Sequence, residues 1–165
     1  MKKTLSLNST VELTSINYAE LLKYLAYTRH KVVLNNTQVN KLLFMCYGCV
    51  LALTGKQMFT DDTPKAWPYG PVFPKVFKRY TPDVHFLSEK EKDVFRNNPD
   101  TLRVCTQIVD KYHILSAYQL SVWSHQENGP WYKTVNDNKK DGKVQWNRVI
   151  PDELIKSYFK DEINA

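Results

Sequence analysis

Apolar residues recur every three or four positions along most of this chain, a spacing that predicts amphipathic helices. The most apolar segment covers residues 38–54, and Gly55 follows it as a helix C-cap. Its apolar side chains surround the helix axis almost completely, which is typical of a central, buried helix. The longest uninterrupted apolar run within it, LLFMCYGCVLAL, is about twelve residues long. Because a membrane span needs about twenty, we expect a core helix and no membrane partner.

Capping signals predict where the other helices begin. Asn17 with Glu20 has the pattern of a capping box at the start of the first helix. Ser88 and Ser116 are each followed three residues later by Glu or Gln, so two further helices are expected to begin there. Pro151 is expected to open a last amphipathic helix.

The segment between the second and third helices is rich in aromatic and turn-forming residues. Residues 56–68 predict a small β-hairpin. Gly70 and Pro71 are expected to open the third helix, whose buried side carries Val72 and apolar residues at spacings of four. A second short strand is expected near residues 144–146.

Together these patterns predict a mainly α fold. We expect a single compact helical domain over residues 1–165, built around a central apolar helix with at most a small β-hairpin. The length suits one domain, since 165 residues can bury one substantial core.

Composition narrows the class of protein only slightly. The formal net charge of +6 allows a nucleic acid, an acidic protein or an anionic surface as partner and selects none of them. Three cysteines are an odd number and no disulfide framework, so a reducing cytoplasm is expected. The start of the chain, MKKTLSLNSTVELTS, lacks the apolar region of a signal peptide, which favours the same compartment.

Two short motifs resemble chemical sites without completing them. Cys46 and Cys49 match C-x-x-C but lie inside an apolar helix, where they are expected to be inert core residues. His125 and Glu127 match the H-x-E of zinc deaminases, yet no cysteine follows Cys105 to hold the metal. A polar cluster of His125 with Glu127 at a helix end is the expected role. With no phosphate loop, dinucleotide fingerprint or nucleophile elbow either, we expect no enzyme, no cofactor and no metal.

DNA binding is an alternative that the sequence allows but does not favour. The predicted helices 101–115 and 116–127 have the spacing of a helix-turn-helix. The second of them, SAYQLSVWSHQE, contains no Lys or Arg to contact phosphates or base edges. A basic stripe at Lys75, Lys78 and Arg79 is explained equally well by a solvated helix face.

Several aromatic residues lie at helix ends and loops instead of on regular stripes: Trp67, Tyr69, Trp123, Trp131 and Tyr132. Buried, they contribute heavily to the core. Exposed on a proline-stiffened loop, they make good anchors for a protein partner, because little conformational entropy is lost on binding. The pattern alone leaves both roles open.

Three segments then occur in a familiar order: KLLFMCYGCVLALTGKQMF, AWPYGPVFPKVFKRY and LSVWSHQENGPW. Together they resemble the Panacea domain of SocA-like antitoxins, with a motif-bearing core of about residues 37–132. The chain departs from the family pattern at Phe44, Cys46, Phe77 and Ser124. The fold is expected to tolerate these changes in side-chain size and polarity, so the expected fold is unaffected.

The resemblance implies an antitoxin that binds and neutralises a cognate protein toxin, expected to be encoded next to it, with a role in phage defence. Two alternatives stay open: an adaptor that delivers the toxin to an ATP-dependent protease, and a DNA-binding regulator. Tyr47, Gly48 and Gly55 are expected to be structural. The motif positions expected to contribute to partner binding are Lys41, Trp67, Tyr69, Gly70, Pro71, Val72, His125, Glu127 and Trp131.

Overall fold

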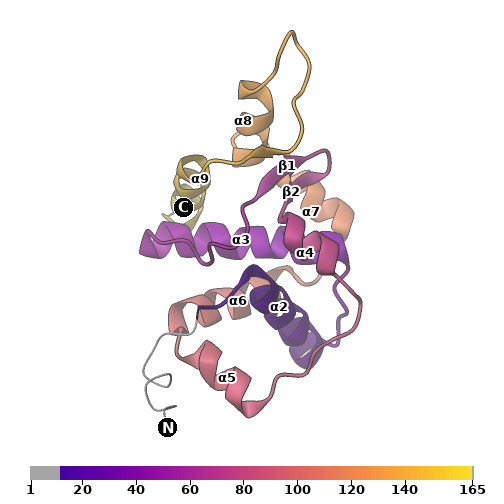
Figure 1. Cartoon of the computed structure of the whole chain (residues 1–165), viewed down its shortest axis with the longest axis vertical. Coiled ribbons are helices and arrows are strands. Elements are labelled where there is room, and N and C mark those ends of the chain that lie inside the picture. The colour runs from indigo at the N-terminus through magenta and orange to yellow at the C-terminus, as the bar shows by residue number, and fades with distance from the viewer. Residues whose placement is uncertain (1–11, 165) are drawn as a thin grey trace.

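The computed structural model describes residues 12–164, and over this range the chain is mainly α-helical, as the sequence predicts (Figure 1). The described residues form eight helices and three short strands. In chain order these are α2 (Ser15–His30), α3 (Asn36–Thr54), β1 (Lys65–Trp67), β2 (Gly70–Val72), α4 (Pro74–Arg79), α5 (Glu89–Arg96), α6 (Pro99–Tyr112), α7 (Ala117–Ser124), α8 (Pro130–Asp137), β3 (Arg148–Val149) and α9 (Asp152–Asn164).

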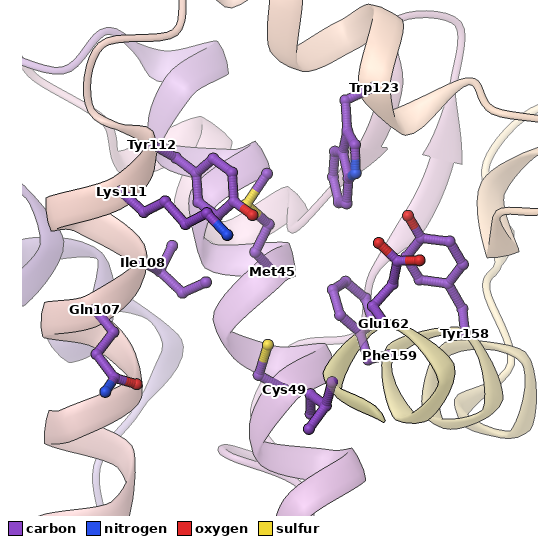
Figure 2. Close-up of a pocket in the computed structure, with 11 residues that line it drawn as sticks. Met45, Cys49, Gln107, Ile108, Lys111, Tyr112, Trp123, Tyr158, Phe159 and Glu162 are labelled. Atoms are coloured by element: carbon purple, nitrogen blue, oxygen red, sulfur yellow. The ribbon is translucent and has the colours of Figure 1, made fainter. Parts of the chain in front are cut away.

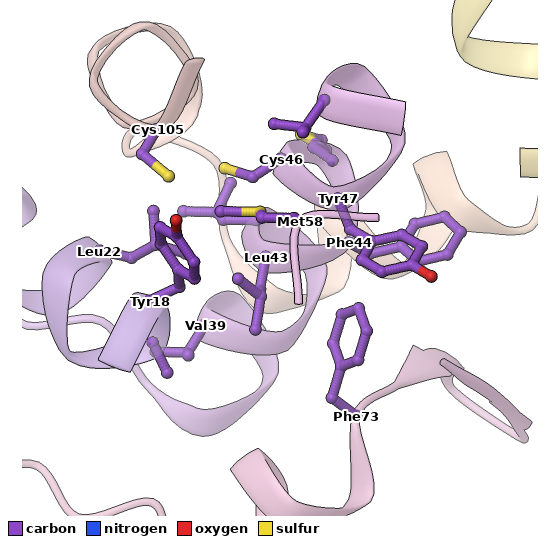
Figure 3. Packing of buried hydrophobic residues seen from close by; sticks show 14 of the residues in the cluster. Tyr18, Leu22, Val39, Leu43, Phe44, Cys46, Tyr47, Met58, Phe73 and Cys105 are labelled. Atoms are coloured by element: carbon purple, nitrogen blue, oxygen red, sulfur yellow. The ribbon is translucent and has the colours of Figure 1, made fainter. Parts of the chain in front are cut away.

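The central helix is α3. Figure 1 shows it between two groups of elements, with α2, α5 and α6 on one side and the hairpin, α8 and α9 on the other. Asn35 caps its start in a capping box with Gln38, and Gly55 ends it with a φ of 74°, in the left-handed region that glycine adopts without strain. Its side chains interleave with those of α2, α6 and the segment around Phe73, as Figure 3 shows. The prediction of a central buried helix is therefore confirmed.

The first helix begins earlier than the sequence pattern predicts. Thr14, not Asn17, is the N-cap, and Asn17 is the third helical residue that returns the hydrogen bond to the Thr14 backbone. Asp61 adds a contact that no local pattern contains, because its carboxylate accepts from the Ser15 N–H and hydroxyl at 2.8 Å each. This remote carboxylate fixes the helix start three residues before the expected position.

The β-hairpin forms later in the chain than residues 56–68. β1 and β2 pair antiparallel with Trp67 opposite Gly70, and β3 joins the free edge of β1. Gly70 and Pro71 therefore lie in a strand and do not open a helix. Pro74 takes that place as the first residue of α4. The expected strand at residues 144–146 is instead β3, a few residues further on.

The later helices follow their capping signals more closely. Ser88 and Ser116 both form complete capping boxes, which confirms those two predictions. α7 ends at Ser124 instead of residue 127, and the last helix begins directly after Pro151. None of the helices described here combines the length and apolar character needed to cross a bilayer.

Candidate functional site

A buried lysine lies where α3, the hairpin and α7 meet. The Lys41 side chain is 1% exposed, and its ammonium donates a hydrogen bond to the Pro71 carbonyl at 3.2 Å. Within residues 12–164 no carboxylate lies close enough to pair with it. Burial therefore lowers the pKa of Lys41 from its ordinary value of 10.5 to about 8.

Gly70 is required at this junction for two reasons. Its φ is 116°, in the range that L side chains rarely adopt. A Cβ at this position would also lie 2.4 Å from the Ser124 Oγ and 2.8 Å from the Lys41 Cε. Beside it, the Asn40 side chain on α3 accepts from the Phe73 N–H at 2.8 Å. The hairpin thus rests directly on α3 and the end of α7.

The two tryptophans of the family-like motifs hold the turn end of the hairpin. The Trp131 Nε1 donates to the Trp67 carbonyl at 2.8 Å, and the Trp67 Nε1 donates to the Asn147 side chain at 2.9 Å. The Trp67 ring also contacts Phe77 edge-on, at 5.1 Å between ring centres. These contacts join β1 to α8, to the segment before β3 and to α4.

His125 stacks on Trp131, with 4.0 Å between ring centres, and does not pair with Glu127, whose side chain is exposed. The expected His–Glu polar cluster is therefore wrong, because the aromatic face offers the imidazole a closer partner. The His125 Nε2 is buried and has no hydrogen-bond partner among the described residues. Burial, and after it the charge of Lys41, lowers the pKa of His125. Another histidine, His113, stacks on His30 with 3.7 Å between ring centres.

Most of the predicted partner-binding residues lie in the interior. The structure divides them by exposure: Lys41, Gly70, Pro71, Val72 and Trp131 are buried, Trp67 and His125 are half-buried, and Tyr69 and Glu127 are exposed. All but Glu127 share one region around the hairpin. Their role in binding a partner stays a prediction.

The outer side of α7 was missed as a candidate surface. Tyr118 and Val122 on α7 are 77% and 53% exposed, Ile114 in the turn before it is 75% exposed, and the helix sequence AYQLSVWS contains no charged residue. The sequence carries this signal, because a short, uncharged helix with apolar residues on more than one face cannot bury all of them. The absence of charge in this helix therefore argues against DNA binding and also leaves an apolar surface exposed.

A groove on another side of the molecule runs between α6 and α9 over α3 (Figure 2). Its volume is about 290 Å³, and Met45 and Cys49 form part of its floor. Burial raises the pKa of the Cys49 thiol to about 11, so this cysteine is a neutral thiol near pH 7. Among the residues that the structure describes, no three metal-ligating side chains gather in one place.

One comparison identifies the family. The sequence model of "Antitoxin SocA-like, Panacea domain" matches residues 39–132, which is more than half of the chain. No curated protein and no solved structure matches the chain significantly. The matched region includes the buried Lys41, the hairpin and the His125–Trp131 stack described above. The chain belongs to the SocA-like antitoxin family and carries its Panacea domain.

Proposed function

We propose that this protein neutralises a cognate toxin by binding it directly, through the hairpin turn and the outer side of α7. The observation that carries the proposal is a pair of exposed tyrosines, one in the hairpin turn and one on a helix without charged residues. Tyr69 and Tyr118 are each 77% exposed, and neither is covered by another part of the described chain. The centres of protein interfaces are enriched in tyrosine and depleted in charge, which is the composition of this surface.

The hairpin is suited to present Tyr69 because both residues that flank the turn are fixed. Trp67, directly before the turn, is held through its carbonyl and its indole N–H, and Gly70, directly after it, rests against Ser124 at the end of α7. A preorganised turn loses little conformational entropy on binding, so more of the contact energy contributes to affinity. The same contact places the turn next to α7, whose outer side supplies Tyr118 and Val122.

Co-expression tests the proposal. The protein encoded next to this chain's gene should arrest growth when expressed alone, and co-expression of this chain should restore growth. The two proteins should co-purify as a stoichiometric complex that buries more than about 1,000 Å². Failure of both rescue and co-purification would refute the proposal. Rescue that disappears in cells without their ATP-dependent proteases would favour an adaptor over direct neutralisation.

Point variants assign the surface. Tyr69→Ala and Tyr118→Ala should weaken the complex and leave the free energy of unfolding nearly unchanged, because both side chains are exposed. Leu53→Ala is the matched control, since Leu53 is also exposed but lies at the far end of α3. If the tyrosine variants neutralise the toxin as well as Leu53→Ala does, the binding surface lies elsewhere.

A further inference from the structure

The positive charge of this chain is concentrated in two segments. Residues 63–81 contain four Lys or Arg and no Asp or Glu, and residues 133–149 contain five Lys or Arg and two Asp. Together the two segments have a formal charge of +7, so the remainder of the chain has a formal charge of −1 within the total of +6. The excess of cations therefore belongs to the hairpin, α4, α8 and the segment that leads to β3.

The fold joins these two segments into one region. β1 pairs with β3, and α8 packs against both strands. Phe77 on α4 contacts the Trp67 ring, and the Trp67 indole donates to Asn147, which lies between Trp146 and Arg148 in the chain. We call the nine cations of the two segments the basic region: Lys65, Lys75, Lys78, Arg79, Lys133, Lys139, Lys140, Lys143 and Arg148. All but the half-buried Lys65 are exposed, and none forms a salt bridge within residues 12–164.

The segment between α8 and β3, which projects from one end of the molecule in Figure 1, holds two of these lysines directly opposite each other. Lys140 and Lys143 exchange two backbone hydrogen bonds of 2.9 Å each. Asp141 and Gly142 between them have φ angles of 52° and 76°, as the central residues of a type I′ turn do. Like charges directly opposite each other on an antiparallel pair are destabilising. A phosphate between the two ammonium groups would remove this repulsion and accept charge-assisted hydrogen bonds from both.

We propose that the basic region binds a single-stranded nucleic acid, with a phosphate between Lys140 and Lys143 and a base stacked on Trp146. Trp146 is 45% exposed and Phe77 is 41% exposed, so aromatic rings stand among the cations, as they do on surfaces that bind single strands. The bases of a duplex are already stacked within it, which favours a single strand.

A nucleic acid also fits this region better than a protein does. Seven of its nine cations are lysines, a residue type that is depleted at protein interfaces. The uncharged helix α7 is not part of the region, so the inference does not depend on the proposed toxin-binding surface.

Charge variants test the phosphate contacts. Fluorescence anisotropy of a labelled oligo(dT) of about twenty nucleotides should show binding to the isolated chain at about 20 mM NaCl, and the affinity should fall steeply toward about 200 mM. Lys140→Gln/Lys143→Gln should weaken binding severalfold. It should also make the slope of log K against log salt shallower by about 1.4, since each phosphate contact to a single strand contributes about 0.7. Lys90→Gln/Lys160→Gln is the matched control, because it removes the same charge from exposed positions on α5 and α9.

Variants of Trp146 test the stacked base. Trp146→Ala should weaken the binding of oligo(dT) at least about fivefold and leave the salt slope unchanged, because base stacking neutralises no phosphate. Trp146→Phe keeps an aromatic ring and should keep most of the affinity. Trp146 also stacks on Trp131, with 6.3 Å between ring centres, so urea unfolding checks that both variants are folded. An abasic oligonucleotide of the same length removes the bases without changing the protein, and it should also bind at least about fivefold more weakly.

Four outcomes would overturn this proposal and leave the proposed function intact, because the assay contains no toxin. The first is no binding of oligo(dT) at about 20 mM NaCl. The second is an equal loss of affinity in Lys90→Gln/Lys160→Gln, since net charge alone would then explain the binding. The third is a duplex of about twenty base pairs that binds more tightly than oligo(dT), together with an abasic oligonucleotide that binds equally well, which would make duplex DNA the ligand. The fourth is a toxin complex weakened by Lys140→Gln/Lys143→Gln in the absence of oligo(dT) binding, which would assign the region to an acidic surface of the toxin.

Discussion

Replacing Lys41 with methionine should change how the stability of this protein depends on pH. The pKa of Lys41 is lowered from 10.5 to about 8 by burial, so the folded state binds this proton more weakly than the unfolded state does. Below about pH 8 the ammonium is charged in both states, and its desolvation destabilises the fold by about 3 kcal/mol relative to the neutral amine. That penalty disappears as the pH rises from about 8 to about 10.5.

The Met variant removes the charge and keeps most of the volume. It also leaves the Pro71 carbonyl without its donor, which costs about 1–3 kcal/mol. At pH 7 we therefore expect the free energy of unfolding of Lys41→Met to equal that of the wild type or to exceed it by up to about 2 kcal/mol. At pH 10 we expect the variant to be less stable relative to the wild type than it is at pH 7. Urea unfolding at a series of pH values measures this difference, and other titrating groups cancel in the comparison. Lys133→Met, at an exposed position on α8, is the control. A difference between Lys41→Met and the wild type that is the same at every pH would refute the reasoning.

Three further predictions concern packing and the hairpin. A Cβ on Gly48 would lie 2.0 Å from the Phe159 ring, so Gly48→Ala should lower the free energy of unfolding by about 1–3 kcal/mol in urea unfolding. Adding Phe159→Leu to the same chain should recover part of that loss in the same assay. Tyr47→Phe should destabilise the fold by about 1–2 kcal/mol in thermal and urea unfolding, because the Tyr47 hydroxyl donates a hydrogen bond to Asp152 at 2.8 Å. Tyr132→Phe is the control and should have little effect, because the Tyr132 hydroxyl makes no hydrogen bond within the described residues. Trp67→Ala should destabilise the fold by about 3 kcal/mol or more while Tyr69→Ala does not. Equal stability of the two variants would show that Trp67 does not hold the turn end of the hairpin.

The parts of the fold that the sequence predicts well depend on neighbours in the chain. The capping boxes at Ser88 and Ser116 and the glycine stop at Gly55 each involve residues within one helical turn. Their hydrogen bonds form locally, so the pattern of residue types was sufficient to place them. The apolar run of α3 was equally clear, because a helix that is apolar all round has to be buried.

The errors occur where a distant residue decides between two local possibilities. Thr14 and Asn17 are both good caps, and Asp61, far along the chain, fixes the helix start at Ser15. Gly70 and Pro71 have the composition of a helix start, yet β1 pairs with them and Pro74 offers a second start three residues later. The position of β3 depends on pairing with β1 across about eighty residues. No local pattern contains these contacts.

The motif residues of the candidate site also fall into two groups, buried and exposed, and this difference indicates which residues determine the choice of partner. Five of the nine motif residues expected to bind a partner are buried, and they join α3, the hairpin, α7 and α8 to one another. Such residues explain why the family motif is recognisable, because changing any of them disturbs the packing of several elements at once. A buried side chain touches no partner directly, so discrimination between toxins has to come from exposed positions. Tyr69 lies inside the second family motif, whereas Tyr118 lies just before the third. Partner choice is therefore expected to change through substitutions at exposed positions such as Tyr118, while the buried motif residues keep the scaffold constant.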